Sequence, residues 1–193
     1  MMPRVYFDIE ALAAAEDTGM SAPALRGRML TLLHPLFAAK PHTYALAIPT
    51  GRQAVCDRGG GALRVFASSR DDLDALAASL SGLPWMRDYA RLHYPASVPE
   101  NYAGAWVAFR RYRVPSLKSD RRTGAEAGQL RQRRMQTVQK EKMDYFIVSS
   151  KTTEQRFTLA VRRESGSPPQ AECLPNSYGL CSAHNVFCVP DLP

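Results

Sequence analysis

The sequence predicts an α+β fold in which a βαββαβ half, residues 1–95, precedes a second half, residues 96–193, that contains an arginine-rich helix. Three observations support this prediction. Short β-prone apolar segments alternate with two helical segments in the first half. A proline-containing stretch, residues 94–101, then interrupts the periodicity and marks the boundary between two domains. Beyond it, basic residues become concentrated and the apolar spacing changes.

The first half contains four predicted strands and two predicted helices. Residues 5–9 are typical of a buried strand, and residues 44–48, 62–68 and a segment within 87–93 are typical of three more. Ser21, followed by Pro23, predicts the start of a helix that runs to about residue 39. A second helix is predicted over residues 71–80, beginning near Ser69. This βαββαβ order predicts a ferredoxin-like domain.

The second half is predicted to form an α/β domain. Residues 106–114, 145–149 and 157–162 are strand-like, with a hairpin expected around residues 151–155 and a last strand near residues 186–189. Residues 121–128 are polar and turn-prone, and residues 165–169 indicate a loop. Residues 129–142 are good helix formers without a clean apolar stripe, so a core alone would anchor this helix poorly.

Composition predicts a soluble cytoplasmic protein. The chain has 193 residues, of which 45% are hydrophobic and 22% charged, as in ordinary globular proteins. It has no apolar stretch of the roughly 20 residues that cross a bilayer, and its start is unlike a signal peptide, so we expect no membrane partner. Four cysteines are too few for a dense disulfide framework, which favours free thiols.

The positive charge is concentrated in one segment. The net charge is +7, and residues 104–142 contain eleven basic and three acidic residues, whereas the rest of the chain contains fourteen basic and fifteen acidic ones. A solvated helix surface would explain an isolated run of charge. The concentration of the whole excess instead indicates a polyanionic partner, most often nucleic acid, because arginine makes bidentate contacts to phosphates and guanine.

Two histidines are candidates for proton transfer. His34 lies at the edge of the first helix's apolar stripe, and His42 lies at the exit of that helix. A neutral imidazole can take a proton near neutral pH, and RNA carries a nucleophile, its 2′-OH, that requires deprotonation. A lone helical histidine is more often structural, and the pattern alone does not decide between the two residues.

Two further clusters have both a functional and a structural interpretation. Ser149, Ser150, Thr152 and Thr153 follow a strand, and their hydroxyls suit a turn or hydrogen bonds to ribose and phosphate. Phe157 could stack on an unpaired base. Separately, the series Cys173, Cys181, His184 and Cys188 matches no standard zinc spacing, so no metal is predicted.

Several short motifs, in their order along the chain, resemble the CRISPR-associated repeat endoribonuclease of subtype I-F systems, a Csy-type Cas repeat nuclease. These are Leu33-His34 on a helix, Arg113-Val114 before an arginine-bearing helix, and Ser150-x-Thr152 followed by Phe157. The ending Tyr178-Gly179-Leu180, with Phe187 and Pro190 after it, completes the resemblance, which covers nearly the whole chain.

The resemblance implies an endoribonuclease that cuts at the base of a repeat RNA hairpin to mature crRNA, without metal or cofactor. It also implies that the enzyme leaves a 2′,3′-cyclic phosphate, stays on its product as a monomer, and joins other subunits of a type I-F-like interference complex. His34 would be the general base, Ser150 would restrain the ribose and Tyr178 would orient His34. The RNA contacts would come from Arg113, Lys118, Arg121, Arg122, Arg131, Arg133, Arg134, Thr152 and Phe157.

Two other functions are consistent with the same residues. One is a subunit that binds the RNA hairpin within a crRNA-guided complex without cutting it. The other is a regulator that binds duplex DNA. Only the enzyme would shorten a repeat hairpin in EDTA, and only the DNA-binding regulator would be indifferent to the 2′-OH. Gln132 and Gln136 stand where the resemblance would place basic residues.

Overall fold

The computed structural model describes residues 1–12, 18–49, 61–115, 125–149 and 156–193, with the backbone alone described for residues 125–127. The strands form two antiparallel sheets, and the chain also contains several helices, which confirms the α+β fold class. The elements follow in the order β1 (Val5–Ala11), α2 (Ala22–Ala39), β2 (Ala45–Ala47), β3 (Ala62–Ala67), α3 (Arg70–Ser81), α4 (Pro84–Tyr89), β4 (Ala90–Leu92), β5 (Ala96–Ser97), β6 (Trp106–Tyr112), α5 (Ala125–Lys140), β7 (Asp144–Ser149), β8 (Arg156–Gly166) and β9 (Val189–Pro190).

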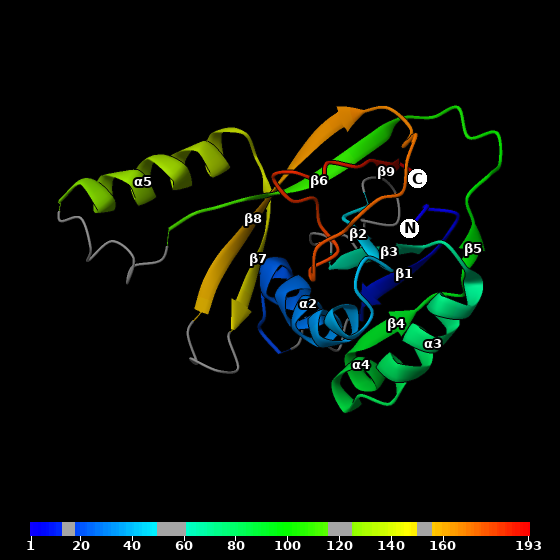
Figure 1. The fold of residues 1–193 in the computed structure, drawn as a ribbon. Helices are drawn as coiled ribbons and strands as arrows, with labels where there is room; N and C mark the ends of the chain where they lie inside the picture. Colours follow the sequence, from blue (N-terminus) through cyan, green and yellow to red (C-terminus); the bar gives the residue numbers. More distant parts are fainter. Residues whose placement is uncertain (13–17, 50–60, 116–124, 150–155) are drawn as a thin grey trace.

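The first sheet has the strand order β2-β3-β1-β4, with β5 paired to the start of β1. Neighbouring strands are antiparallel, and β1 and β3 are central, which is the order that the βαββαβ pattern predicts. Figure 1 shows α2 and α3 in front of this sheet. Ser69 caps α3, since its hydroxyl accepts a hydrogen bond from the amide of Asp72.

A buried ion pair crosses the centre of the first sheet. Asp8 of β1 and Arg64 of β3 are opposite each other in the register, and two hydrogen bonds of 2.6 and 2.8 Å join them. The Arg64 guanidinium also donates to the carbonyl oxygens of Leu192 and Pro193. This arginine therefore connects the last residues of the chain to the first sheet, and its charge is paired despite being buried.

The second sheet has the order β7-β8-β6-β9. Strand β8 pairs with β6 over the full length of β6 and with β7 on its other side. The antiparallel pairing of β7 and β8 confirms the predicted hairpin, whose connecting residues 150–155 lie outside the described residues. Strands β7 and β9 are therefore the two edge strands of this sheet.

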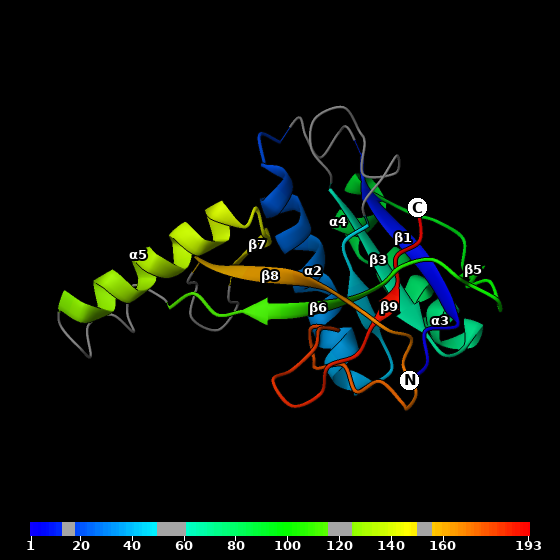
Figure 2. The ribbon, with the colours of Figure 1, turned by 90° about the horizontal axis from the view of Figure 1, so that it is seen from above.

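Helix α2 lies between the two sheets, as the two views in Figures 1 and 2 show. It packs against β7, while its apolar face joins the core. One buried apolar cluster includes Leu33 and Leu46 from the first half together with Phe109 and Phe146 from the second. The two halves of the chain thus share a continuous core, and α2 is the element at their seam.

Several boundaries differ from those the sequence predicts. The loop predicted over residues 165–169 is wrong at its start, because β8 continues to Gly166 opposite Trp106. Helix α5 begins at Ala125, inside the segment predicted to be turn-prone, and the last strand is Val189–Pro190 rather than residues 186–189. Helix α4 was not predicted, because six residues are too few to establish a periodic pattern.

Helix α5 projects from the body of the molecule, as Figures 1 and 2 both show. Its apolar contacts with the body come from its second half: Val138 packs with Met143 and Ala160 in a small cluster, to which Tyr112 and Val114 contribute. The side chains of residues 128–130 and 132–134 are exposed. In the described part of the chain, no helix is both long enough and apolar enough to span a membrane.

Candidate active site

Helix α2 supplies the histidine at the seam between the sheets. Its apolar residues Met29, Leu30, Leu33 and Phe37 are buried in the core, which fixes the rotation of the helix. His34 follows Leu33 at the margin of this buried face and is half-buried. The imidazole is thus attached to a rigid element but lies where the core meets solvent.

A glycine allows α2 to approach β7 very closely. A Cβ atom built on Gly27 would lie 1.9 Å from the carbonyl oxygen of Ile147, so only glycine fits this contact. One residue earlier, Arg26 forms an ion pair of 2.9 Å with Asp144, at the start of β7. His34 follows Gly27 by seven residues, or about two helical turns, so the two lie on the same side of α2. The close packing of α2 on β7 therefore also sets the position of His34.

The tail of the chain supplies the tyrosine. The side-chain oxygen of Asn176 accepts hydrogen bonds from the amides of Tyr178, at 2.8 Å, and Leu180, at 3.3 Å. Gly179 has a φ of +75°, and its carbonyl accepts a hydrogen bond of 2.8 Å from the amide of Leu46 in β2. A Cβ at Gly179 would lie 2.8 Å from that amide nitrogen. Asn176 and Gly179 thus shape the turn that holds Tyr178 against the first sheet.

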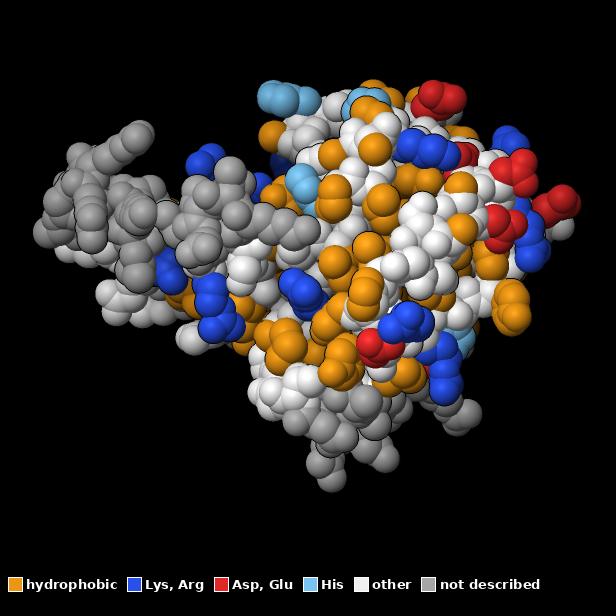
Figure 3. Space-filling model, turned by 90° about the horizontal axis from the view of Figure 1, so that it is seen from below, with side chains coloured by type: hydrophobic (Ala, Val, Ile, Leu, Met, Phe, Trp, Pro, Cys, Tyr) orange, Lys and Arg blue, Asp and Glu red, His pale blue; other side chains and the backbone are white. Residues whose placement is uncertain are grey.

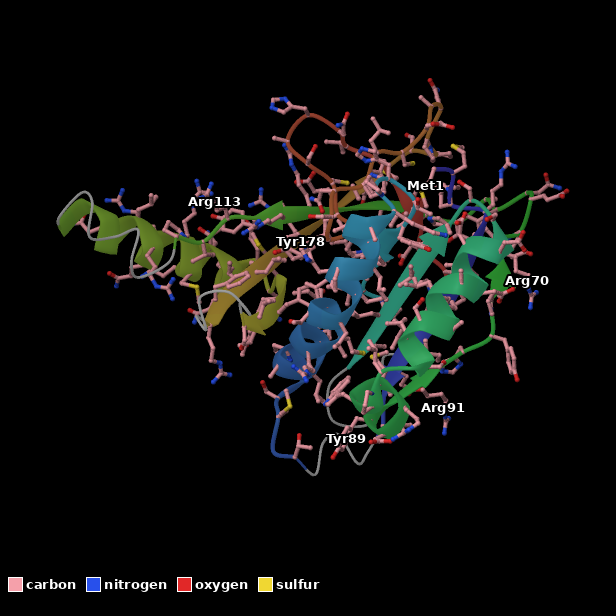
Figure 4. All side chains as sticks on the ribbon, turned by 60° about the horizontal axis from the view of Figure 1, so that its bottom comes forward. Met1, Arg70, Tyr89, Arg91, Arg113 and Tyr178 are labelled. Atoms are coloured by element: carbon pink, nitrogen blue, oxygen red, sulfur yellow. The ribbon has the colours of Figure 1, made fainter. Side chains whose placement is uncertain are left out.

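The same turn is bonded to the second sheet. The amide of Cys181 donates to the carbonyl of Phe109 in β6 at 2.9 Å, and Cys181 forms a parallel bridge with Arg110. The segment around Tyr178 therefore bridges both sheets. In Figure 4, Tyr178 lies where α2 meets the strands of the second sheet.

His34 and Tyr178 are in contact. Their ring centroids are 4.3 Å apart and the rings are inclined by 43°. Burial lowers the pKa of His34 below its ordinary value of 6.5, because desolvation disfavours the charged imidazolium. The imidazole is consequently neutral at neutral pH and can accept a proton, while the tyrosine ring limits its orientation. The structure brings together these two predicted residues from distant parts of the chain.

His42, the other histidine candidate, is engaged elsewhere. It is exposed, has a φ of +61°, and its Nδ1 donates a hydrogen bond of 2.9 Å to the carbonyl of Pro175. This bond helps to hold the tail rather than to form a reactive centre. Between the two histidines, the geometry favours His34 as the base.

Arg111 is a further candidate site residue. It belongs to the basic segment whose arginines are predicted to contact nucleic acid, but its place beside Tyr178 is not predicted from the sequence. Its guanidinium carbon lies 5.9 Å from the centroid of the Tyr178 ring, and the side chain is exposed. A strand alternation of Arg110, Arg111 and Tyr112 was visible in the sequence, but the position of the tail on β6 was not.

The predicted RNA-binding arginines lie on and beside α5. Arg113 is exposed just after β6, at the base of the projecting helix (Figure 4). Arg133 and Arg134 are exposed, and the Arg134 guanidinium lies 4.9 Å from the centroid of the Tyr112 ring. Arg131 is half-buried and donates to the carbonyl of Pro115. Part of the predicted set thus contacts other residues at the base of the helix, whereas Arg113 and Arg133 are exposed.

The charge around α5 is positive. On the face drawn in Figure 3, most of the acidic side chains lie at the end of the molecule away from α5, and the coloured charged side chains near α5 are Lys and Arg. Arg162 also stacks on Tyr112, 5.2 Å from the ring centroid, while it is paired with Glu141. This arrangement concentrates positive potential on the projecting helix and its base.

The remaining predicted residues divide into two groups. Phe157 is half-buried opposite Val148 and packs on the main core, so only part of its ring is available for stacking on a base. The others lie outside the described residues, although Ser149 is described as exposed at the end of β7. They are Ser150, Thr152, Lys118, Arg121 and Arg122.

The described residues contain no group of three or more His, Cys, Asp or Glu side chains that could hold a metal ion. Cys173, Cys181 and Cys188 are buried free thiols, whereas His184 is exposed. Burial raises the pKa of the Cys173 thiol to about 11, which keeps it protonated.

Comparison with known proteins places the chain in a family. A search of curated proteins gave no match. A family model described as CRISPR-associated protein (Cas_Csy4) matches residues 6–191, and the match includes α2, the projecting helix and the tail that contains Tyr178. The chain therefore belongs to the Cas_Csy4 family of CRISPR-associated proteins.

Proposed function

We propose that this protein is a metal-independent endoribonuclease that binds a CRISPR repeat RNA hairpin and cleaves it at its base to mature crRNA. Its family membership supports a role in CRISPR repeat processing. The observation that carries the catalytic part is the contact between His34 and Tyr178, because it holds an imidazole with a lowered pKa at the seam of the two sheets.

The projecting helix α5 is proposed to bind the stem of the hairpin. Its first half has exposed side chains and makes little use of the core, so folding alone does not explain a well-formed basic helix there. The major groove of A-form RNA is deep and narrow, so the helix is expected to enter near an end of the stem, where the groove opens. Arg113 and Arg133 are the described arginines best placed to contact phosphate or guanine.

The proposed reaction is an internal transfer of the phosphodiester. His34 takes the proton of the ribose 2′-OH, and the resulting oxygen attacks the adjacent phosphorus. A new bond joins the 2′-oxygen to phosphorus while the bond from phosphorus to the 5′-oxygen breaks. The 5′-oxygen takes a proton, from water or from the protonated His34. The products are a 2′,3′-cyclic phosphate and a 5′-hydroxyl, and no metal is required at any step.

The other residue roles follow the family pattern. Ser150, just beyond the described end of β7, is proposed to hold the attacking ribose, with Thr152 and Phe157 contacting the RNA nearby. Lys118, Arg121 and Arg122 would contact the stem together with Arg131 and Arg134. Residues 1–95 would supply the base, and residues 96–193 would supply most of the binding surface. Two domains of the predicted boundaries would then meet at the scissile phosphate.

The decisive experiment incubates the purified protein with a repeat hairpin in EDTA. We expect the wild-type protein to cut once and to leave a cyclic phosphate, His34→Ala to abolish cutting, and His42→Ala, the matched control, to cut normally. A hairpin with a 2′-deoxyribose at the cleavage position should bind but stay intact. Binding without cutting by the wild-type protein would instead support a non-catalytic hairpin-binding subunit. Equal binding of duplex DNA would support a regulator.

Product retention is a separate part of the proposal. The protein is proposed to remain, as a monomer, on the 3′ hairpin of the crRNA and to join other subunits of a type I-F-like complex. Size-exclusion chromatography after complete cleavage should elute one protein chain together with the cut hairpin. Free protein and free RNA in separate peaks would contradict retention.

A further inference from the structure

The strand β6 places one arginine at the catalytic pair and its neighbours elsewhere. Successive residues of a strand point to opposite faces. Arg110 lies 3.8 Å from Glu164, and Tyr112 lies between Arg134 and Arg162, whereas Arg111 lies beside the ring of Tyr178. The alternation of this strand therefore directs only Arg111 toward the residues that contact His34.

The charge of Arg111 is not neutralised within the described part of the chain, where the side chain has no ion-pair partner. Its exposure leaves the N–H groups accessible to a ligand. A guanidinium is always charged and its planar fork fits two oxygens of a phosphate. Arg111 thus has a free positive charge beside the tyrosine ring that contacts His34.

The proposed reaction needs a positive charge at this place. As the 2′-oxygen attacks, negative charge develops on the two non-bridging oxygens of the scissile phosphate. His34 is neutral before the reaction, and the proton that it takes comes from the 2′-OH, so it supplies no fixed positive charge to these oxygens. We propose that Arg111 is a catalytic residue whose guanidinium binds these two oxygens and stabilises the transition state of the cleavage. This inference rests on the proposed function and adds the missing electrostatic component to it.

The position of Arg111 predicts an effect on rate rather than on affinity. Its side chain lies at the Tyr178 contact, on the face of β6 opposite to Tyr112, which is the residue that contacts Arg134 of α5. Loss of one preorganised donor to a developing oxyanion typically slows the chemical step by about 10²–10³-fold. The uncleaved hairpin is also held by the other arginines that are proposed to contact its stem, so its affinity for the protein should change little.

The test measures single-turnover cleavage of a repeat hairpin by four variants, and the dissociation constant of each for the 2′-deoxy hairpin. We expect Arg111→Ala to cleave about 10²-fold or more slowly than the wild type, with a dissociation constant changed by less than about threefold. Arg111→Lys should recover part of the rate, because it restores the charge without the fork. Arg110→Ala, the matched neighbour on the opposite face of β6, should cleave at close to the wild-type rate, and His34→Ala should be inactive.

Added guanidinium ion separates catalysis from structure. At non-denaturing concentrations it should raise the cleavage rate of Arg111→Ala but not that of Arg110→Ala or the wild type. A slow Arg111→Ala that neither lysine nor guanidinium improves would overturn the proposal and show that Arg111 only supports Tyr178. Arg111→Ala at the wild-type rate, with His34→Ala inactive, would also overturn it but leave the proposed function intact. Wild-type cleavage by His34→Ala would refute the proposed function itself.

Discussion

Replacement of Gly27 by alanine tests whether the contact between α2 and β7 positions His34, the proposed general base. The added Cβ would lie 1.9 Å from the carbonyl oxygen of Ile147 and 2.6 Å from its carbon. Non-bonded atoms normally keep about 3.5 Å, so the helix and the strand would have to separate by about 1.5 Å. The obstacle is backbone held in the β7–β8 ladder, where Ile147 is opposite Thr158, and it cannot rotate away as a side chain could.

The expected loss of stability follows from two opposing effects. Overpacking a core contact costs about 1–3 kcal/mol, and an overlap with backbone belongs at the upper end of that range. Alanine in place of glycine in a helix returns about 1 kcal/mol. The free energy of unfolding should therefore fall by about 2 kcal/mol, which corresponds to a melting temperature lower by about 4–8 °C for a chain of this size.

Gly128→Ala is the matched control, because Gly128 is also helical but has no atom within 4 Å of its added Cβ. It should gain up to about 1 kcal/mol, since only the helix preference acts. Urea unfolding of both variants measures the contrast. Below its melting temperature, Gly27→Ala should also cleave the hairpin about 10²-fold more slowly, because a displacement of about 1 Å in a catalytic group has effects of that size. Equal stability of the two variants, or wild-type cleavage by Gly27→Ala, would refute the reasoning.

Three further predictions concern the protonation of His34, the projecting helix α5 and the buried ion pair of Asp8 and Arg64. Because burial lowers the pKa of His34, the cleavage rate should rise with pH with a midpoint below 6.5 and should level off above it. A midpoint above 6.5 would contradict the assignment. The same shift means that the unfolded state binds a proton first as pH falls, so stability should decrease below about pH 6.5 down to the folded-state pKa, and a His34→Gln variant should lack this part of the decrease in urea unfolding. Arg133→Ala should weaken hairpin binding and reduce the log–log slope of its salt dependence by about 0.7–0.9. The double replacement of Gln132 and Gln136 by alanine should weaken binding without changing this slope, because neutral amides displace no counterions. Equal slopes for the two variants in filter-binding assays would contradict this distinction. Arg64→Met should lower the free energy of unfolding by about 3–5 kcal/mol because Asp8 is left buried without its partner, and the added replacement Asp8→Leu should restore much of the loss in thermal melts, unless the pair contributes net stability.

The elements that the sequence predicts best are those with long periodic patterns. Helix α2 starts directly after Ser21 and ends at Ala39, as the apolar spacing and Pro23 predict. Helix α3 follows its Ser69 cap in the same way. Both contain enough turns for the burial pattern to outweigh local preferences. The order of the first sheet then follows from the known topology of the βαββαβ arrangement.

Segments whose structure depends on distant partners were harder to predict. The end of β8 has Ser165 and Gly166 in a composition typical of a loop, yet both pair with β6 because that strand extends far enough to reach them. Residues 125–128 contain Gly128, which favours a turn, but they form the first turn of α5. In both cases the local preference is weak and a neighbouring element decides the conformation.

The candidate site was predicted only in part. Periodicity placed His34 on a helix but could not separate it from His42, and only the resemblance linked it to Tyr178. The contact between them depends on the tail, which has little regular structure and no pattern that reports its path. The contact of Arg111 with Tyr178 could not be predicted for the same reason. The role of Gly27 could not be predicted either. A glycine within a helix usually lowers the stability of the helix, whereas here it permits the close contact with Ile147.

The turn at Tyr178 is hydrogen-bonded to Leu46 on one sheet and to Phe109 on the other. Rotation of either half against the other would have to break these bonds, so the protein should meet its RNA with the imidazole already aligned. Little of the free energy of RNA binding would then be used to reorganise the protein, and conformational change on binding would be confined to the RNA and to the projecting helix α5. If the proposed function holds, the site is rigid before RNA binds, and selectivity should depend on whether the RNA strand can adopt the shape that the site requires.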